Sequence, residues 1–202
     1  MTDQPAAPIE LRTARLLLRR PRPEDADAYT AMATDPEYAA FGSRQPPDRE
    51  ATVRALARII ATPWHLRPEF AVVLAGPGAG PFSGLADGRT DGPVVGRVSL
   101  DVDAQNGLAG LGYGIARPYW GQGLASEAAQ AAIDYAFDSL LAAKVWARVD
   151  PRNVASVRVL EKLGMQREGL LRSQVVHWGE RADRAAYGLL RAEWLAQHAG
   201  GV

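Results

Sequence analysis

The stretch that decides the fold runs from Arg117 to Phe137 and reads RPYWGQGLASEAAQAAIDYAF. Its second half is rich in alanine and carries apolar residues at helical spacing, which predicts a helix over residues 122–137. Two glycines, Gly121 and Gly123, stand where this helix begins, although glycine there costs backbone entropy. We therefore expect either a turn that needs glycine geometry or a ligand that approaches the backbone closely.

A helix start offers unpaired N–H groups and the positive end of the helix dipole, which together attract phosphate. Glycines ahead of it would let a phosphate reach those donors without meeting a Cβ atom. Plain turn chemistry is the alternative. Two other phosphate motifs are excluded, since no Gly-Lys-Ser/Thr sequence is present and Ser126 occupies the third glycine position of a dinucleotide-binding loop.

The segments around this helix predict a hairpin and two further elements. Asn106 and Gly107 form a hairpin turn signal, and glycines at 110, 112 and 114 leave one face of the next strand nearly bare. A strand at 144–150 follows the helix. A second helix is expected at 153–164, with Asn153 as its N-cap and Gly164 as its C-terminal glycine.

The N-terminal half predicts a strand at 16–19, helices at 23–35 and 48–63, and strands at 69–74 and 94–102. A Gly/Pro-rich segment at 75–93 is expected to be a mobile loop insertion. Residues 165–178 and 181–194 are expected to be strands. Alternating strands and helices with hairpins indicate one α+β (mixed α/β) domain over 8–197, with short tails at 1–7 and 198–202.

Composition excludes several classes of protein. The 202 residues carry 23 basic and 23 acidic side chains, so no net charge draws the chain toward nucleic acid or a membrane surface. The absence of cysteine excludes disulfides and thiolate metal sites and fits a reducing cytoplasm. The N-terminus has no signal-peptide pattern, and no apolar run reaches the roughly 20 residues of a membrane span.

Three motifs in order resemble the GCN5-related N-acetyltransferase (GNAT) family, in its ribosomal-protein-alanine acetyltransferase (RimJ/RimL-like) branch. In chain order they are the opening TARLLLRRPRPEDADAY, then LGYGIARPYWGQGLASEA, then DPRNVASVRVLEKLGMQREG. The final YGLLRAEW also matches the family's closing strand. The resemblance covers almost the whole chain. It implies a GNAT fold: a mostly antiparallel twisted sheet of about seven strands flanked by about four helices, with strands splayed at the acetyl-CoA site.

The resemblance also implies the cofactor site. The family's pyrophosphate-binding signature falls on Trp120, Gly121, Gln122, Gly123, Leu124 and Ala125, with Ser126 as a further donor. Trp120 departs from the family's Gln or Arg but leaves the backbone donors in place. Ile115 would pair with the pantetheine arm, and Asn153 would contact it as well as cap its helix. No metal is implied, and the three histidines, at 65, 177 and 198, form no metal-ligand pattern.

Only some of the catalytic groups that the resemblance implies are present in this sequence. Ser156 matches a serine that some members of the branch use to protonate the leaving thiolate, although it is also an ordinary helix first-turn residue. The family's tyrosine acid is excluded because that position is Leu160. The two positions that carry a general-base carboxylate in relatives are here glycine and valine, at 110 and 175. Possible substitutes are Glu168, Tyr113 and His177.

The resemblance therefore predicts an acetyltransferase that moves an acetyl group from acetyl-CoA to a primary amine by direct attack, without a covalent enzyme intermediate. Without a strong base, an N-terminal α-amine of a protein or peptide is the expected acceptor. The alternatives are a small-molecule amine acceptor, a non-catalytic acyl-CoA-binding module, and a nucleotide-binding protein that uses the same helix start. A homodimer through exposed strand edges is also compatible with the sequence.

Overall fold

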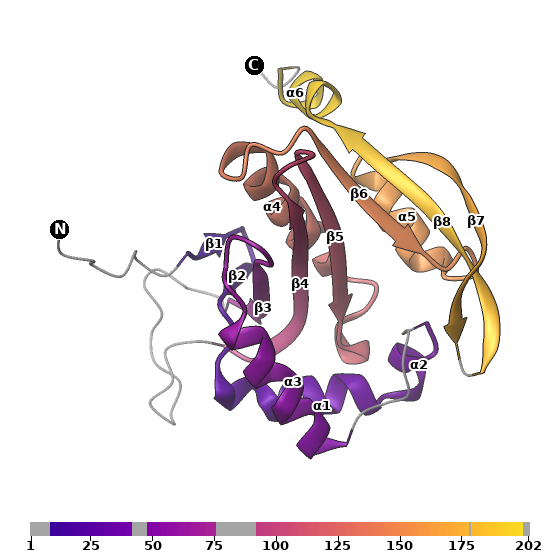
Figure 1. The fold of residues 1–202 in the computed structure, drawn as a ribbon. Helices are drawn as coiled ribbons and strands as arrows, with labels where there is room; N and C mark the ends of the chain where they lie inside the picture. The colour runs from indigo at the N-terminus through magenta and orange to yellow at the C-terminus, as the bar shows by residue number, and fades with distance from the viewer. Residues whose placement is uncertain (1–8, 42–47, 76–91, 178, 200–202) are drawn as a thin grey trace, which may run out of the picture.

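The computed structural model describes residues 9–41, 48–75, 92–177 and 179–199. These residues form one eight-stranded sheet in the order β1-β2-β3-β4-β5-β6-β8-β7 (Figure 1). Every neighbouring pair is antiparallel except β5 and β6, which are parallel. The strands are β1 Leu11–Arg12, β2 Leu16–Arg19, β3 Glu69–Leu74, β4 Val94–Asp103, β5 Leu108–Ile115, β6 Lys144–Val149, β7 Gln166–His177 and β8 Glu180–Leu190.

Helices cover both faces of the sheet. They are α1 Ala26–Thr34, α2 Pro36–Ala39, α3 Arg49–Ala61, α4 Leu124–Asp138, α5 Val154–Lys162 and α6 Arg191–Ala199, with short 3₁₀ turns η1 Pro23–Asp25 and η2 Arg117–Tyr119. The α4 helix buries a face of small residues, including Ala128, Ala129 and Ala132, which lets it lie close against the sheet. On the other face, a second cluster is formed by Tyr29, Met32 and residues of α3 and β3.

Most of the expected elements are confirmed, with small shifts at their ends. The strand at 16–19 is β2, and Gly107 turns the β4–β5 hairpin with φ +64°. The Asp48 carboxylate caps α3 by accepting a hydrogen bond from the Ala51 N–H at 2.7 Å. Asn153 caps α5, and Gly164 follows that helix with φ +76°. The helix expected from 122 begins at Leu124 because Gly123, with φ +76°, is its N-cap.

Three expectations need correction or lie outside the described residues. The strand expected at 181–194 ends at Leu190, and the final RAEW segment, residues 191–194, instead begins the helix α6. The described residues hold eight strands and six α-helices instead of about seven and four. The Gly/Pro-rich loop at 75–93 falls mostly on residues 76–91, which lie outside the described part of the chain.

The expected splay lies between β5 and β6. The two strands pair only from Leu108 opposite Lys144 to Gly110 opposite Trp146. Beyond that point β5 continues along β4 and β6 continues along β8, so the two strands diverge (Figure 1). Along Leu111–Ile115, the β5 edge that faces β6 has no strand partner among the described residues.

The face of β5 that the glycines were expected to leave bare is instead occupied by aromatic side chains. A Cβ atom on Gly110 would lie 2.6 Å from the Trp146 ring, and one on Gly114 would collide with the Tyr38 hydroxyl. A Cβ atom on Gly112 would lie 3.0 Å from the Ser99 hydroxyl oxygen. The glycines therefore make room for side chains from β6, α2 and β4.

Candidate active site

A cavity of about 530 Å³ lies at the end of β5 that diverges from β6, and it is lined by β5, α2 and the starts of α4 and α5. Every site residue predicted from the sequence lines it except Gln122. They are Ile115, Trp120, Gly121, Gly123, Leu124, Ala125, Ser126, Asn153 and Ser156. The fold thus brings together segments that lie about thirty residues apart in the chain.

The cavity is lined from both faces of the sheet. Successive side chains of a strand point to opposite faces. Gly114 faces Tyr38 of α2, whereas the neighbouring Tyr113 donates its hydroxyl to the Ser156 carbonyl of α5 at 3.0 Å. Both α2 and α5 contribute to the lining. The cavity therefore joins α5 on one face of the sheet to α2 on the other.

The two glycines before α4 both adopt a left-handed backbone conformation. The φ values are +72° at Gly121 and +76° at Gly123, a region that residues with a Cβ atom rarely adopt. Turn chemistry therefore accounts for both glycines. No atom lies within 4 Å of the position that a Cβ would take on Gly121. The first intrahelical bond runs from the Glu127 N–H to the Gly123 carbonyl at 3.1 Å, so the N–H groups before it carry the helix's free positive end.

Arg15 and Glu127 brace this loop. The Arg15 guanidinium donates to the Gln122 carbonyl at 2.9 Å and pairs with the Glu127 carboxylate at 2.6 Å. A trans peptide directs its N–H opposite to its C=O, so the Gly123 N–H points away from Arg15. Partial burial works to raise the pKa of Glu127, but hydrogen bonds from Thr13 and Arg15 lower it on balance. Sequence reasoning missed this brace, because its partners lie more than 100 residues apart.

Trp120 changes what is expected of Ile115. Its indole N–H donates to the Ile115 carbonyl at 2.6 Å, so that carbonyl already has a partner. The Trp120 side chain is on the cavity wall and 44% exposed, which leaves it room to move. The pairing of the Ile115 backbone with a ligand stays a prediction. A ligand that bonds to the Ile115 carbonyl must first displace the Trp120 indole. The Gln122 amide is directed toward the Pro118 carbonyl at 3.5 Å.

Asn153 and Ser156 lie at the start of α5. The Asn153 side-chain oxygen accepts a hydrogen bond from the Ser156 N–H at 3.1 Å, which confirms the capping role. This bond leaves the Asn153 amide N–H₂ as a donor beside the cavity. The position of Ser156 fits both an ordinary first-turn residue and a group that reaches into the cavity.

None of the three substitute bases is well suited to take a proton from an amine. Burial raises the pKa of Tyr113, and its hydroxyl is already donated to Ser156. Glu168 is on β7, where it pairs with Lys144 at 2.5 Å. His177 is buried at the C-terminal end of β7 and does not line the cavity. No carboxylate can stand at position 110 without displacing Trp146.

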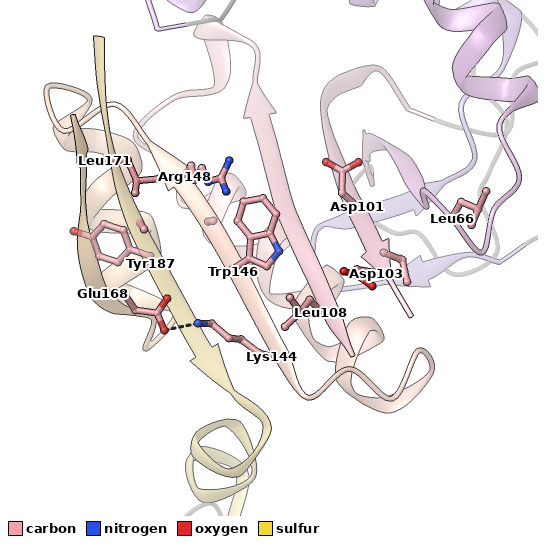
Figure 2. A pocket seen from close by; sticks show the side chains of 13 residues that line it. Leu66, Asp101, Asp103, Leu108, Lys144, Trp146, Arg148, Glu168, Leu171 and Tyr187 are labelled. Atoms are coloured by element: carbon pink, nitrogen blue, oxygen red, sulfur yellow. Dashed lines mark hydrogen bonds and ion pairs between the residues drawn. The ribbon is translucent and has the colours of Figure 1, made fainter. Parts of the chain in front are cut away.

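A second cavity of about 610 Å³ lies over the strands next to the splay, and Trp146 stands at its centre (Figure 2). Asp101 and Asp103 of β4 face it from one side and Glu168 of β7 from the other. The Arg148 guanidinium lies over the Trp146 ring at 4.7 Å. The lining of this cavity combines charged side chains of both signs with apolar side chains.

In the parts of the chain that the structure describes, no three His, Asp or Glu side chains gather as a metal site. No helix of the described ranges is both long and apolar enough to span a membrane.

Comparison with known proteins identifies the family. Residues 15–166 match the model of the acetyltransferase (GNAT) domain. An uncharacterized N-acetyltransferase p20 of Bacillus licheniformis is 35% identical over 185 residues, which is 91% of this chain and 97% of that protein.

Two solved structures share the fold at low identity. One is the ribosomal-protein-S5-alanine acetyltransferase of Vibrio fischeri, with TM-score 0.73, 19% identity, and coverage of 92% of this chain and 98% of the other. The second is the spermidine N-acetyltransferase of Vibrio cholerae in complex with CoA and spermine, with TM-score 0.73, 19% identity, and coverage of 91% and 99%. The matched family model, the full-length relative and the splayed sheet agree, and the chain belongs to the GNAT family of acetyltransferases.

Proposed function

We propose that this protein transfers an acetyl group from acetyl-CoA to the N-terminal α-amine of a protein or peptide. The observation that carries the proposal is the cavity at the end of β5, which is lined by the glycine-containing start of α4 on one side and by residues of α2 on the other. A direct transfer needs both reactants in one such passage. It needs no nucleophilic side chain, which suits a chain without cysteine.

The residues present fit coenzyme A. The left-handed Gly121 and Gly123 expose backbone N–H groups at the positive end of α4, where a pyrophosphate would be held. Asn153 has an amide N–H₂ group beside the same cavity. When bound, acetyl-CoA supplies an activated acyl group as a thioester. The chain's own part is to hold the cofactor, orient the amine and polarise the acyl oxygen through N–H groups on the unpaired edge of β5.

The choice of an α-amine follows from proton affinity. An α-amine has a pKa of about 7.7–8.0, so roughly a tenth of it is neutral at pH 7, whereas a lysine amine has a pKa of about 10.4. The difference of about 2.5 pH units corresponds to about 3.5 kcal/mol of deprotonation free energy. No carboxylate stands at positions 110 and 175, so the acceptor that needs less free energy to lose its proton is favoured.

A small polyamine is the second candidate acceptor. The Vibrio cholerae neighbour is a spermidine acetyltransferase, and the cavity of Figure 2 has three carboxylates, from Asp101, Asp103 and Glu168. Two of these carboxylates already pair with Arg67 and Lys144, which reduces their attraction for a cationic chain. The α-amine therefore stays the first choice.

Release of free CoA, followed with a thiol reagent, tests the proposal. The purified protein is given acetyl-CoA and, separately, an alanine-initiated peptide, the same peptide with a blocked N-terminus and an internal lysine, and spermidine. We expect turnover on the free α-amine at pH 7 to exceed turnover on the lysine peptide at least tenfold. Equal rates on the two peptides would contradict the α-amine preference. Tight CoA binding with no release for any amine would identify a non-catalytic binding module instead.

A further inference from the structure

One face of the sheet has a row of residues that joins the interior to the splay. Register places Glu69 of β3 opposite Ser99 of β4, and Ser99 opposite Gly112 of β5. Residues directly opposite each other in antiparallel strands point to the same face, with their Cβ atoms about 4.5–5.5 Å apart. The Ser99 hydroxyl confirms this direction, because a Cβ atom on Gly112 would lie 3.0 Å from it.

Glu69 is buried and only half satisfied. The residue is 1% exposed, and its Oε2 atom pairs with the Arg97 guanidinium at 2.8 Å. Its Oε1 atom has no hydrogen-bond partner in the described part of the chain. A buried carboxylate oxygen without a donor is costly, so its presence calls for an explanation.

The far end of the row lies beside the candidate reaction site. Gly112 precedes Tyr113 and Gly114, which line the cavity at the end of β5. On its other side, Trp146 and Ala147 line the cavity of Figure 2. An amine that arrives on the same face as α2 would therefore pass over Gly112 and meet the Ser99 hydroxyl, which takes up the room left by the missing side chain.

Several other titratable or charged groups face Glu69 or lie close to it. Arg97 comes from β4, Tyr29 from α1 and Tyr38 from α2, and the Arg19–Asp25 ion pair joins β2 to η1 on the same face. The Tyr29 hydroxyl also has no hydrogen-bond partner among the described residues. Arg97 pairs with the buried Glu69 carboxylate, and its own side chain is one-third exposed.

We propose that Glu69 is the proton acceptor of the transfer reaction and that Ser99 relays the proton from an amine bound over Gly112. This inference rests on the proposed function and names a group that replaces the missing carboxylate at position 110. The position on β3 explains why no strong base was found near β5. The relay crosses two strand spacings, about 10 Å, which one serine and the length of a glutamate side chain can span with a water molecule.

The proton count of the step balances. The acceptor enters as an ammonium and loses two protons. The Ser99 hydroxyl takes the first while its own proton passes through a bridging water molecule to Glu69 Oε1, which has no hydrogen-bond partner among the described residues, and the freed nitrogen lone pair forms the C–N bond. The C–S bond breaks with its electron pair on sulfur, and the second nitrogen proton goes to that sulfur. The products are an amide, a free thiol and a protonated Glu69, which returns its proton to solvent.

The pH dependence of kcat/KM for an alanine-initiated peptide tests the proposal. With a base, kcat/KM should stay nearly flat between pH 6 and 7.5. In Glu69→Gln only amine that is already neutral can react, so kcat/KM should rise about tenfold per pH unit up to the pKa of the amine, near 8. At pH 6 we expect a loss of about a hundredfold, within the range of general-base catalysis. A weakly basic amine that is neutral at pH 7 should react equally fast with both proteins.

Two further variants separate the relay from a structural role. Ser99→Ala should show the same rising profile, and it keeps the test open if Glu69→Gln does not fold. Tyr29→Phe removes a buried hydroxyl from the same cluster but not from the row, so its profile should stay flat. A flat pH profile of kcat/KM in Glu69→Gln or Ser99→Ala, or a rising profile in Tyr29→Phe, overturns the assignment of Glu69 and Ser99. The proposed function still stands in that case, provided that the wild-type protein turns over. A wild-type protein that acetylates no amine overturns both.

Discussion

Replacing Gly121 or Gly123 by alanine separates the two reasons for a glycine at the start of α4. Both residues have φ above +70°, and an L-residue held there costs about 1–2 kcal/mol of folding stability. For a chain of this length, that corresponds to about 2–4 °C in Tm per kcal/mol. Space is not the obstacle, because a Cβ on Gly121 meets no atom within 4 Å and one on Gly123 meets only Arg15 at 3.6 Å.

Gly179 supplies the matched control. It has φ +84°, its Cβ position is also open, and it lies in the β7–β8 turn away from the cavity. Gly179→Ala should therefore lose as much stability as the other two variants. Only Gly121→Ala and Gly123→Ala should also bind CoA more weakly, because a methyl group then stands where the pyrophosphate would approach.

The affinity loss can be estimated from one hydrogen bond to a charged group, about 1.5–3 kcal/mol, or about 10- to 150-fold in Kd. Isothermal titration calorimetry with CoA, at a temperature where all the variants are folded, measures it. Unchanged affinity in both Gly121→Ala and Gly123→Ala would refute the cradle, and turn chemistry would then be the only reason for these glycines. An equal loss of affinity in Gly179→Ala would show that the effect reflects general instability.

Three other changes test neighbouring parts of the site. Trp120→Phe removes the hydrogen bond from the indole to the Ile115 carbonyl, which is worth about 1 kcal/mol. CoA should then bind up to about fivefold more tightly, as measured by calorimetry. Weaker binding would mean that the indole itself holds the ligand. Arg152 donates hydrogen bonds to Asp150 and lowers the pKa of that buried carboxyl from 3.8 to about 2. The ionised carboxylate therefore adds about 2 kcal/mol to the free energy of unfolding. This contribution is fully present above pH 4 and is lost as the pH falls through 2. Urea unfolding should show this loss in the wild type but not in Asp150→Asn. Gly110→Ala crowds the Trp146 ring and should cost about 1–3 kcal/mol of unfolding free energy. Adding Trp146→Leu should recover most of that cost, and if it does not, the crowding argument fails.

The sequence by itself determined the local elements and the family. Caps at Asp48 and Asn153, the turn at Gly107 and the periodic apolar positions of α4 act over a few residues, so their signals can be read without the fold. The order of three motifs then identified the acetyltransferase family and the residues at the start of α4. The error at 191–194 has the same local origin, because a short helix after a strand has only a weak pattern of its own.

The tertiary structure decided how residues distant in the chain meet. The Arg15–Glu127 brace joins residues 112 apart, Trp146 fills the space over Gly110, and register aligns Glu69, Ser99 and Gly112 across three strands. In the sequence, Glu69 is simply the first residue of a strand, and the alternation of Arg97, Ser99 and Asp101 indicates a polar face without saying what it faces. Strand register and helix placement depend on packing over the whole sheet, which no local pattern encodes.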